Sequence, residues 1–161
     1  MKVLMLNGSC NPKGCTYTAL TEVGKALSSQ GIDYEIVQLD GGPVRDCIGC
    51  NQCSKNGCVF TDDGVNDFIA KARQADGFVF GTPVYYAHPS GRVLSFLDRV
   101  FYAGGSAFAG KPGAAVASAR RAGTTASLDA LGGEYHTPEG TSVWLADVEL
   151  EPYQALLVKN K

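Results

Sequence analysis

Four of the six cysteines lie within one short stretch of the sequence, CIGCNQCSKNGC, at residues 47–58. They are Cys47, Cys50, Cys53 and Cys58, and they follow the spacing C-x2-C-x2-C-x4-C. Four closely spaced thiolates are the ligands that a 4Fe-4S cluster requires. Structural zinc sites also take four thiolates, but their ligands usually come as two pairs separated by a longer stretch. The compact spacing therefore favours iron over zinc.

Two further interpretations of this stretch stay open. It could be an empty, reduced cysteine loop that shapes a dimer interface or the rim of an active site, or it could contain a disulfide. A disulfide is not needed for stability, because a single domain of 161 residues buries roughly two thirds of its unfolded surface. A 4Fe-4S cluster, zinc, a disulfide and an empty loop therefore remain as alternatives.

Chemistry is also expected in loops that are rich in Gly, Ser, Thr or Pro. They are residues 8–18 (GSCNPKGCTYT), 81–91 (GTPVYYAHPSG) and 118–125 (SARRAGTT). Each loop follows an apolar run that is typical of a buried strand. In open parallel sheets, ligands bind outside the carboxyl ends of the strands, where the strand order reverses. The sequence therefore predicts one ligand site that all of these loops form together.

The first of these loops leads into a predicted helix, whose N-terminal N–H groups can bind an anion. Hydroxyl groups of Ser9, Thr16, Tyr17 and Thr18 would add donors. The loop is neither a nucleotide P-loop nor a G-x-G-x-x-G turn, and no Arg follows Cys10 within it, as phosphotyrosine chemistry would need. We expect it to bind a phosphate group. A plain strand-to-helix connection with Ser or Thr capping is the alternative.

The other two loops offer groups that suit a flat, redox-active ring. Residues 83–86 (PVYY) would place backbone groups and aromatic faces at the same edge of the sheet. Arg120 and Arg121 could face the edge of a flavin on which negative charge accumulates on reduction. A phosphate and a flat ring together indicate flavin mononucleotide (FMN). Taken singly, the tyrosines could serve packing and the arginines could be a solvated pair.

Alternating strands and helices would position these loops. Strands are predicted at Val3–Asn7, Ile32–Leu39, Gly77–Gly81 and Gly113–Ser118. Apolar residues at helical spacing predict helices over Leu20–Leu27 with a stop at Gly31, over Val65–Ala72, over Val93–Phe101 and over Thr124–Leu131. Asp62 and Asp63 are predicted to cap the second of these helices. Short connections between strands and helices predict one α/β domain over residues 1–161, with a doubly wound parallel sheet and helices on both faces.

The C-terminal part fits this pattern less well. From about Gly132 the alternation weakens. Residues 142–150 could form a fifth strand, but no amphipathic helix follows it, so the C-terminal strand and helix are atypical.

Composition narrows the class of partner. The net charge is −2 and no basic run is long enough to follow a phosphate backbone, so nucleic acid is not an expected partner. The apolar run Val3–Leu6 is much shorter than a signal-peptide core, and no segment approaches the roughly 20 apolar residues of a membrane span. We therefore expect a cytoplasmic protein without a membrane partner, whose cysteines are reduced unless a metal binds them.

The chain resembles the NAD(P)H-dependent FMN reductases of the flavodoxin-like superfamily, and within them the iron-sulfur flavoprotein branch. The resemblance rests on MLNGSCNPKGCTYTAL, CIGCNQCSKNGCVFTDD, GFVFGTPVYYAHPSGRVLSFLDR and SARRAGTT, and covers residues 1 to about 130. It implies a sheet of strand order 2-1-3-4-5 with FMN as cofactor and NAD(P)H as co-substrate. The residues implied for the FMN phosphate and ribityl chain are Ser9, Asn11, Thr16, Tyr17 and Thr18. Those implied for the isoalloxazine ring are Pro83, Val84, Tyr85, Tyr86, Ser118, Arg120, Gly123 and Thr124.

These features lead to three hypotheses about function. The first is an FMN-dependent oxidoreductase that takes hydride from NAD(P)H and reduces a small acceptor, such as a quinone, a nitro or azo compound, or free flavin. The flavin would carry the chemistry, so no catalytic side chain is expected, and a homodimer or homotetramer would complete the flavin edge. The second is an electron carrier with FMN and a 4Fe-4S cluster, acting between protein partners such as a ferredoxin. The third is a zinc-binding or scaffold module without flavin.

Overall fold

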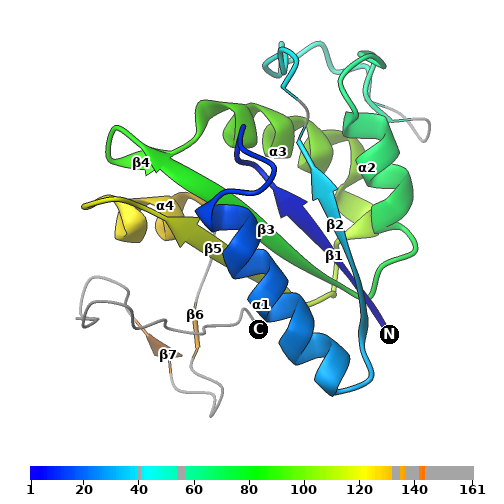
Figure 1. Cartoon of the computed structure of the whole chain (residues 1–161). Coiled ribbons are helices and arrows are strands. Elements are labelled where there is room, and N and C mark those ends of the chain that lie inside the picture. Colours follow the sequence, from blue (N-terminus) through cyan, green and yellow to red (C-terminus); the bar gives the residue numbers. More distant parts are fainter. Residues whose placement is uncertain (40, 54–56, 132–134, 137–141, 144–161) are drawn as a thin grey trace.

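A parallel sheet forms the centre of the structure, a computed structural model that describes residues 1–39, 41–53, 57–131, 135–136 and 142–143. Its parallel strands follow in the spatial order β2 (Asp33–Gln38), β1 (Lys2–Asn7), β3 (Gly77–Tyr85) and β5 (Gly113–Ser118), as Figure 1 shows. This order corresponds to the first four strands of the predicted 2-1-3-4-5 sheet. The predicted flavodoxin-like α/β fold is therefore confirmed.

Strand β1 has no solvated face. Leu4, Met5 and Leu6 are completely buried, as expected for an apolar run in the middle of a parallel sheet. Because side chains alternate along a strand, Met5 packs with Leu20 on one face, while Leu4 and Leu6 pack with the core on the other.

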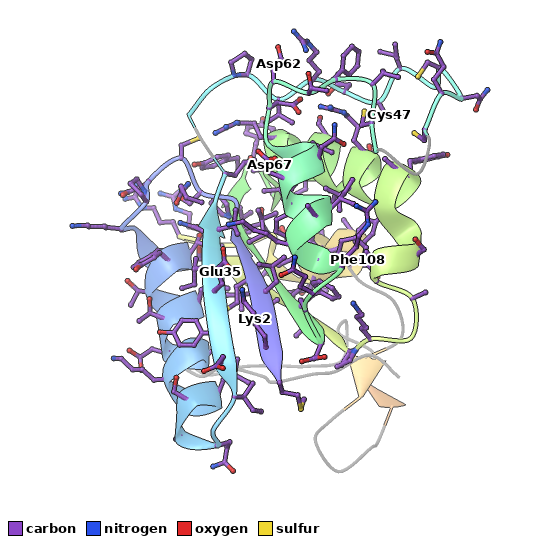
Figure 2. The ribbon with its side chains drawn as sticks, turned by 90° about the vertical axis from the view of Figure 1, so that its right-hand side faces the viewer. Lys2, Glu35, Cys47, Asp62, Asp67 and Phe108 are labelled. Atoms are coloured by element: carbon purple, nitrogen blue, oxygen red, sulfur yellow. The ribbon has the colours of Figure 1, made fainter. Side chains whose placement is uncertain are left out.

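Helices cover both faces of the sheet. Helix α1 (Cys15–Ser29) packs on one face, and helices α2 (Val65–Ala72) and α3 (Gly91–Gly104) pack on the other, as Figure 2 shows with the sheet between them. A short 3-10 helix, η1 (Gly105–Ala107), follows α3, and α4 (Thr124–Leu131) follows β5. The predicted helices are all confirmed, including the stop after α1 at Gly31, whose φ is +70°.

The prediction that residues 81–91 form a loop is partly wrong. Strand β3 continues to Tyr85, and the chain returns as the short antiparallel strand β4 (His88–Pro89). The turn residues Tyr86 and Ala87 have positive φ values of 50° and 71°. Two consecutive residues of positive φ are what a two-residue hairpin turn of type I′ requires, and Asn-Gly or Asp-Gly normally signal it. A Tyr-Ala pair gives no such signal, which is why the sequence did not predict the hairpin.

The predicted fifth strand over residues 142–150 is also corrected where the structure describes it. Its first residues form β7 (Ser142–Val143), which pairs antiparallel with β6 (Tyr135–His136) in a separate two-stranded sheet. Residues 144–150 lie outside the described residues. The single-domain organisation of residues 1–161 stays a prediction. No helix within the described residues is long and apolar enough to cross a membrane.

Glu35 ties the sheet to α2, because its carboxylate accepts hydrogen bonds from Lys2 Nζ at 2.6 Å and from Lys71 Nζ. Figure 2 shows Glu35 and Lys2 on neighbouring strands. The hydrogen bonds from Lys2 and Lys71 lower the pKa of Glu35. The stabilisation is therefore complete above the ordinary carboxyl pKa of about 4.3 and is lost as the pH falls through the lower folded-state value.

We expect Glu35→Gln to reduce the free energy of unfolding at pH 7 by about 0.5–1 kcal/mol, the usual range for a partly exposed ion pair. The difference from wild type should shrink as the pH is lowered below about 4. Urea unfolding at a series of pH values measures it. The control is Glu22→Gln, which removes the exposed pair with Lys25 and should have a smaller effect. An equal loss at every pH would contradict the assignment.

Candidate functional site

The loops at the carboxyl ends of the strands meet at one edge of the sheet. The Gly8 N–H donates to the Gly81 carbonyl at 2.8 Å, which joins the first loop to β3. The hydroxyl oxygens of Thr16 and Ser118 lie 2.7 Å apart, which joins the start of α1 to the end of β5. Pro83 lies beside Ser118 in the β3–β5 register. The structure thus brings residues from all of the predicted ligand loops together.

Glycine allows two close approaches of the chain at this edge. A Cβ on Gly8 would lie 2.8 Å from the Gly81 carbonyl oxygen and 2.1 Å from Val93 Cγ2. Gly123 has a φ of +97°, and a Cβ there would lie 2.7 Å from backbone atoms of Ala87. Any side chain at Gly123 would therefore separate the loop after β5 from the β3–β4 turn.

The first loop forms a cradle of backbone groups at the start of α1. The N-cap residue Gly14 has no side chain, and within the described residues no side chain caps this helix. Its first N–H groups therefore point out of the helix without an intrahelical partner, as an anion site requires. Ser9 Oγ accepts the Asn11 N–H at 3.1 Å, and Asn11 Oδ1 accepts the Lys13 N–H at 3.1 Å. These bonds fix the shape of the loop.

Some predicted phosphate donors are already engaged. The Thr18 hydroxyl donates to the Gly14 carbonyl at 3.2 Å, and the Thr16 hydroxyl bonds with Ser118. Thr16 is buried, while Tyr17 and Asn11 are exposed. Ser9 is buried and retains its hydroxyl proton as a donor. The direct roles of these residues toward a phosphate stay predictions.

The groups predicted to face the flavin ring are mostly open to solvent. Pro83 is buried and Val84 is half-buried, whereas Tyr85 is 51% and Tyr86 102% exposed. Arg120 and Arg121 are exposed, and neither has an ion pair with another described residue. Thr124 begins α4 beside Gly123. Aromatic faces and unpaired cations thus border the sheet edge where the loops meet.

Sequence reasoning missed the polar pair that holds the first loop. Asn7 is completely buried, and its Nδ2 donates to Gln38 Oε1 at 2.6 Å. Gln38 Nε2 then donates to the carbonyl oxygen of Ser9 at 2.7 Å. The signal in the sequence was Asn7 itself, because a polar residue at the end of an apolar buried strand needs a hydrogen-bond partner.

The cysteine segment lies above α2 and α3, where Figure 2 labels Cys47 and Asp62. All four cysteines of the motif line one cavity of about 210 Å³, together with Phe60, Arg99 and Tyr102. The six cysteines of the chain all carry free thiols. Burial raises the pKa of the Cys53 thiol, and the three neighbouring thiols of the motif raise it further. The motif cysteines are thus close enough to interact electrostatically.

The donor set of this cavity fits a sulfur-ligated group. Four sulfurs from one loop around a common cavity match the ligand number and chemistry of a 4Fe-4S cluster or of zinc. Among the described residues, no three His, Cys, Asp or Glu side chains are already arranged as metal ligands. Binding would therefore require the loop to draw the thiols closer together.

One face of α3 contacts the first loop, the residues before the cysteine motif and the motif itself. Arg92 Nη2 donates to the Gly42 carbonyl at 2.9 Å, and Arg92 Nη1 donates to Cys10 Sγ in the first loop at 3.0 Å. One turn further along, Ser95 Oγ bonds with Asp46. Arg99, another turn along, reaches the cysteines themselves. Residues spaced by three or four positions share one helix face, so α3 connects the first loop with the cysteine cavity.

Arg99 is the most deeply placed charge in this network. Its side chain is 1% exposed and pairs with Asp63, which is 4% exposed. Its Nε donates to Cys58 Sγ at 3.3 Å, and its other nitrogens donate to the carbonyls of Arg45 and Phe60, each at 3.3 Å. Burial lowers the pKa of Arg99, but the bonds to Asp63 and Cys58 outweigh it and raise the pKa overall.

The prediction that Asp62 and Asp63 cap a helix is wrong. Gly64 is the N-cap of α2, with a φ of +77°, and no side chain caps the helix in the described structure. Asp63 instead neutralises Arg99, and Asp62 pairs with Arg45 at the surface. A buried guanidinium needs a carboxylate partner. Nothing in the sequence around Asp63 indicated that α3 would place a buried guanidinium beside it.

The comparisons with known proteins agree with this architecture. A family model for NADPH-dependent FMN reductases matches residues 1–136. An iron-sulfur flavoprotein of Methanocaldococcus jannaschii is 36% identical over 100 residues, which cover 62% of this chain and 51% of that protein. One from Archaeoglobus fulgidus is 33% identical over 99 residues, covering 62% of this chain and 48% of that protein. The chain thus spans about half the length of the curated relatives it matches.

A solved structure shows the same fold. FerB, a flavoenzyme NAD(P)H:(acceptor) oxidoreductase from Paracoccus denitrificans, superposes with a TM-score of 0.58 at 16% identity, covering 81% of this chain and 68% of FerB. The family model covers most of the chain, including every loop of the sheet edge and the cysteine motif. The chain belongs to the NADPH-dependent FMN reductase family.

Proposed function

We propose that the protein is an FMN-dependent oxidoreductase that takes hydride from NAD(P)H and reduces a small acceptor. The acceptor class would be a quinone, a nitro or azo compound, or free flavin. One observation carries this proposal: the first, second and third ligand loops meet at the sheet edge beside the uncapped start of α1. Family membership supports the same cofactor.

The residues of this edge would divide the work of binding. The first N–H groups of α1 and the Ser9 hydroxyl would hold the phosphate, because both present donors to an anion. The exposed faces of Tyr85 and Tyr86 would lie against the flat ring. Arg120 and Arg121 would offset negative charge near the ring. Bound FMN would supply the hydride chemistry, while these residues position and tune it.

The exposed tyrosines also suggest how the site is completed. Tyr86 is fully exposed on a turn that the backbone holds in a strained conformation. We propose that a second copy of the chain covers this turn, so that the enzyme is a homodimer or homotetramer. Gel filtration and light scattering of the flavin-bound protein measure this, and a monomer with full flavin retention would contradict it.

Stopped-flow mixing tests the proposed activity. The protein is loaded with FMN, freed of oxygen and mixed with NADPH or NADH, and the visible flavin absorption is followed. We expect rapid bleaching by at least one nicotinamide, followed by recolouring when a quinone is added. Protein that binds FMN but is not bleached by either nicotinamide would contradict the proposal.

A second candidate function is electron transfer with FMN and a 4Fe-4S cluster between protein partners, such as a ferredoxin. The observation in its favour is that all four motif cysteines line one cavity. The curated relatives are named iron-sulfur flavoproteins, which supports the same assignment. Cys47, Cys50, Cys53 and Cys58 would hold the cluster, which supplies one-electron transfer when bound.

Metal analysis separates the alternatives for the cysteine cavity. Protein purified without oxygen would be assayed for iron, acid-labile sulfide and zinc. Iron and sulfide in equal amounts indicate the cluster, and zinc without flavin would instead favour the scaffold hypothesis. For the carrier, we expect bleaching of the flavin by a reduced ferredoxin but not by NADPH.

A further inference from the structure

Arg99 is the cation that directly contacts the sulfur cavity from the protein interior. Its Nε–H donates to Cys58 Sγ at 3.3 Å, and it lines the cavity together with the four motif cysteines. The rest of the guanidinium is held by Asp63 and by the carbonyls of Arg45 and Phe60. The Arg99 guanidinium carbon also lies 5.0 Å from the centroid of the Phe60 ring. This many contacts fix the direction of the Nε–H bond toward sulfur.

We propose that Arg99 is a positioning residue that sets the reduction potential of the cysteine site by donating a hydrogen bond to Cys58 sulfur. The proposal rests on the cluster of the second candidate function. The potential in question is that of the one-electron reduction of the cluster. One electron would enter the cluster, and no bond at Arg99 would form or break. Dithionite supplies this electron in a titration, and reduced flavin would supply it in the electron-transfer function.

The direction of the effect follows from charge. Hydrogen bonds to the sulfurs are one of the factors that set iron-sulfur potentials. Adding an electron makes the sulfurs more negative, so a donor pointing at them stabilises the reduced state. The buried position strengthens this effect, because water screens it little. Asp63 acts in the opposite direction, because its negative charge offsets that of Arg99. Arg99 should therefore raise the potential and Asp63 should lower it.

The test is a potentiometric titration with dithionite, followed by the spectrum of the cluster in protein of known iron content. We expect Arg99→Gln to reduce the equilibrium constant of one-electron reduction about tenfold, which corresponds to a midpoint potential lower by about 59 mV. Asp63→Asn keeps the donor but removes the opposing charge, so it should shift the potential upward. A purely structural role would not give opposite signs for the two variants.

Arg45→Gln provides a matched control. The Arg45 guanidinium lies at the same 5.0 Å from the Phe60 ring and pairs with Asp62, but its side chain is half exposed. It should leave the potential unchanged. If Arg99→Gln does not fold, Arg99→Lys keeps the charge without the planar fork and should give a smaller downward shift.

Each outcome has a definite meaning. Opposite shifts in the Arg99 and Asp63 variants, with none in the Arg45 variant, support the proposal. Shifts of the same sign, or no shift with a full complement of iron, overturn it while leaving the cluster assignment intact. Wild-type protein that takes up no iron and sulfide overturns both the cluster and the role of Arg99, and leaves the FMN oxidoreductase proposal standing.

Discussion

The Gly123→Ala variant is expected to bind FMN about tenfold to a hundredfold more weakly than the wild-type protein. Gly123 has a φ of +97°, a conformation that residues with a Cβ rarely adopt. The added Cβ would also lie 2.7 Å from backbone atoms of Ala87, which cannot move aside like a flexible side chain. Relieving this strain, about 1–3 kcal/mol, would separate the third loop from the β3–β4 turn. Each 1.4 kcal/mol corresponds to about a factor of ten in affinity.

Gly113→Ala is the matched control for this experiment. Gly113 begins β5, the strand that precedes this loop, and a Cβ there would have no neighbour within 4 Å. Fluorescence titration with FMN gives the dissociation constants of both variants, and circular dichroism shows whether each is folded. Equal FMN affinity in a folded Gly123→Ala variant would show that the third loop does not contribute to the flavin site.

Most of the sheet and its helices could be predicted from the sequence, because burial constrains those segments on every side. The apolar run of β1 does not alternate between apolar and polar residues, because the sheet buries the strand on both faces. Helix α2 shows four apolar residues at helical spacing, and all four are buried: Val65, Phe68, Ile69 and Ala72. Once these elements were placed, topology alone predicted that the ligand loops share one edge.

The parts that could not be predicted depend on contacts between distant residues or on unusual turn chemistry. The hydroxyl contact between Thr16 and Ser118 joins residues 102 positions apart. The turn at Tyr86 and Ala87 carries none of the residues that normally adopt positive φ. Arg99 lies on a helix that otherwise reads as amphipathic, and only the folded structure shows that it is buried against Asp63 and Cys58. The motif cysteines were evident, but the cation beside them was not.

The second large effect concerns the stability that Arg99 and Asp63 provide together. We expect Arg99→Met to reduce the free energy of unfolding by about 3–5 kcal/mol, because it leaves the Asp63 carboxylate buried without a partner. The carbonyls of Arg45 and Phe60 would also lose their donor. Urea unfolding of the metal-free protein measures the loss, so that cluster binding does not contribute.

The double variant Arg99→Met with Asp63→Leu distinguishes the buried charge from the other contacts. Replacing both partners removes the unpaired carboxylate, so the double variant should be more stable than Arg99→Met alone. It should not reach wild-type stability, because each carbonyl left without a donor costs about 1–3 kcal/mol if water does not replace it. Arg45→Met, which breaks only the exposed pair with Asp62, should cost no more than about 1 kcal/mol. If Arg99→Met cost as little as Arg45→Met, water would have to reach the Asp63 carboxylate in the variant, and the pair would not act as a buried charge pair.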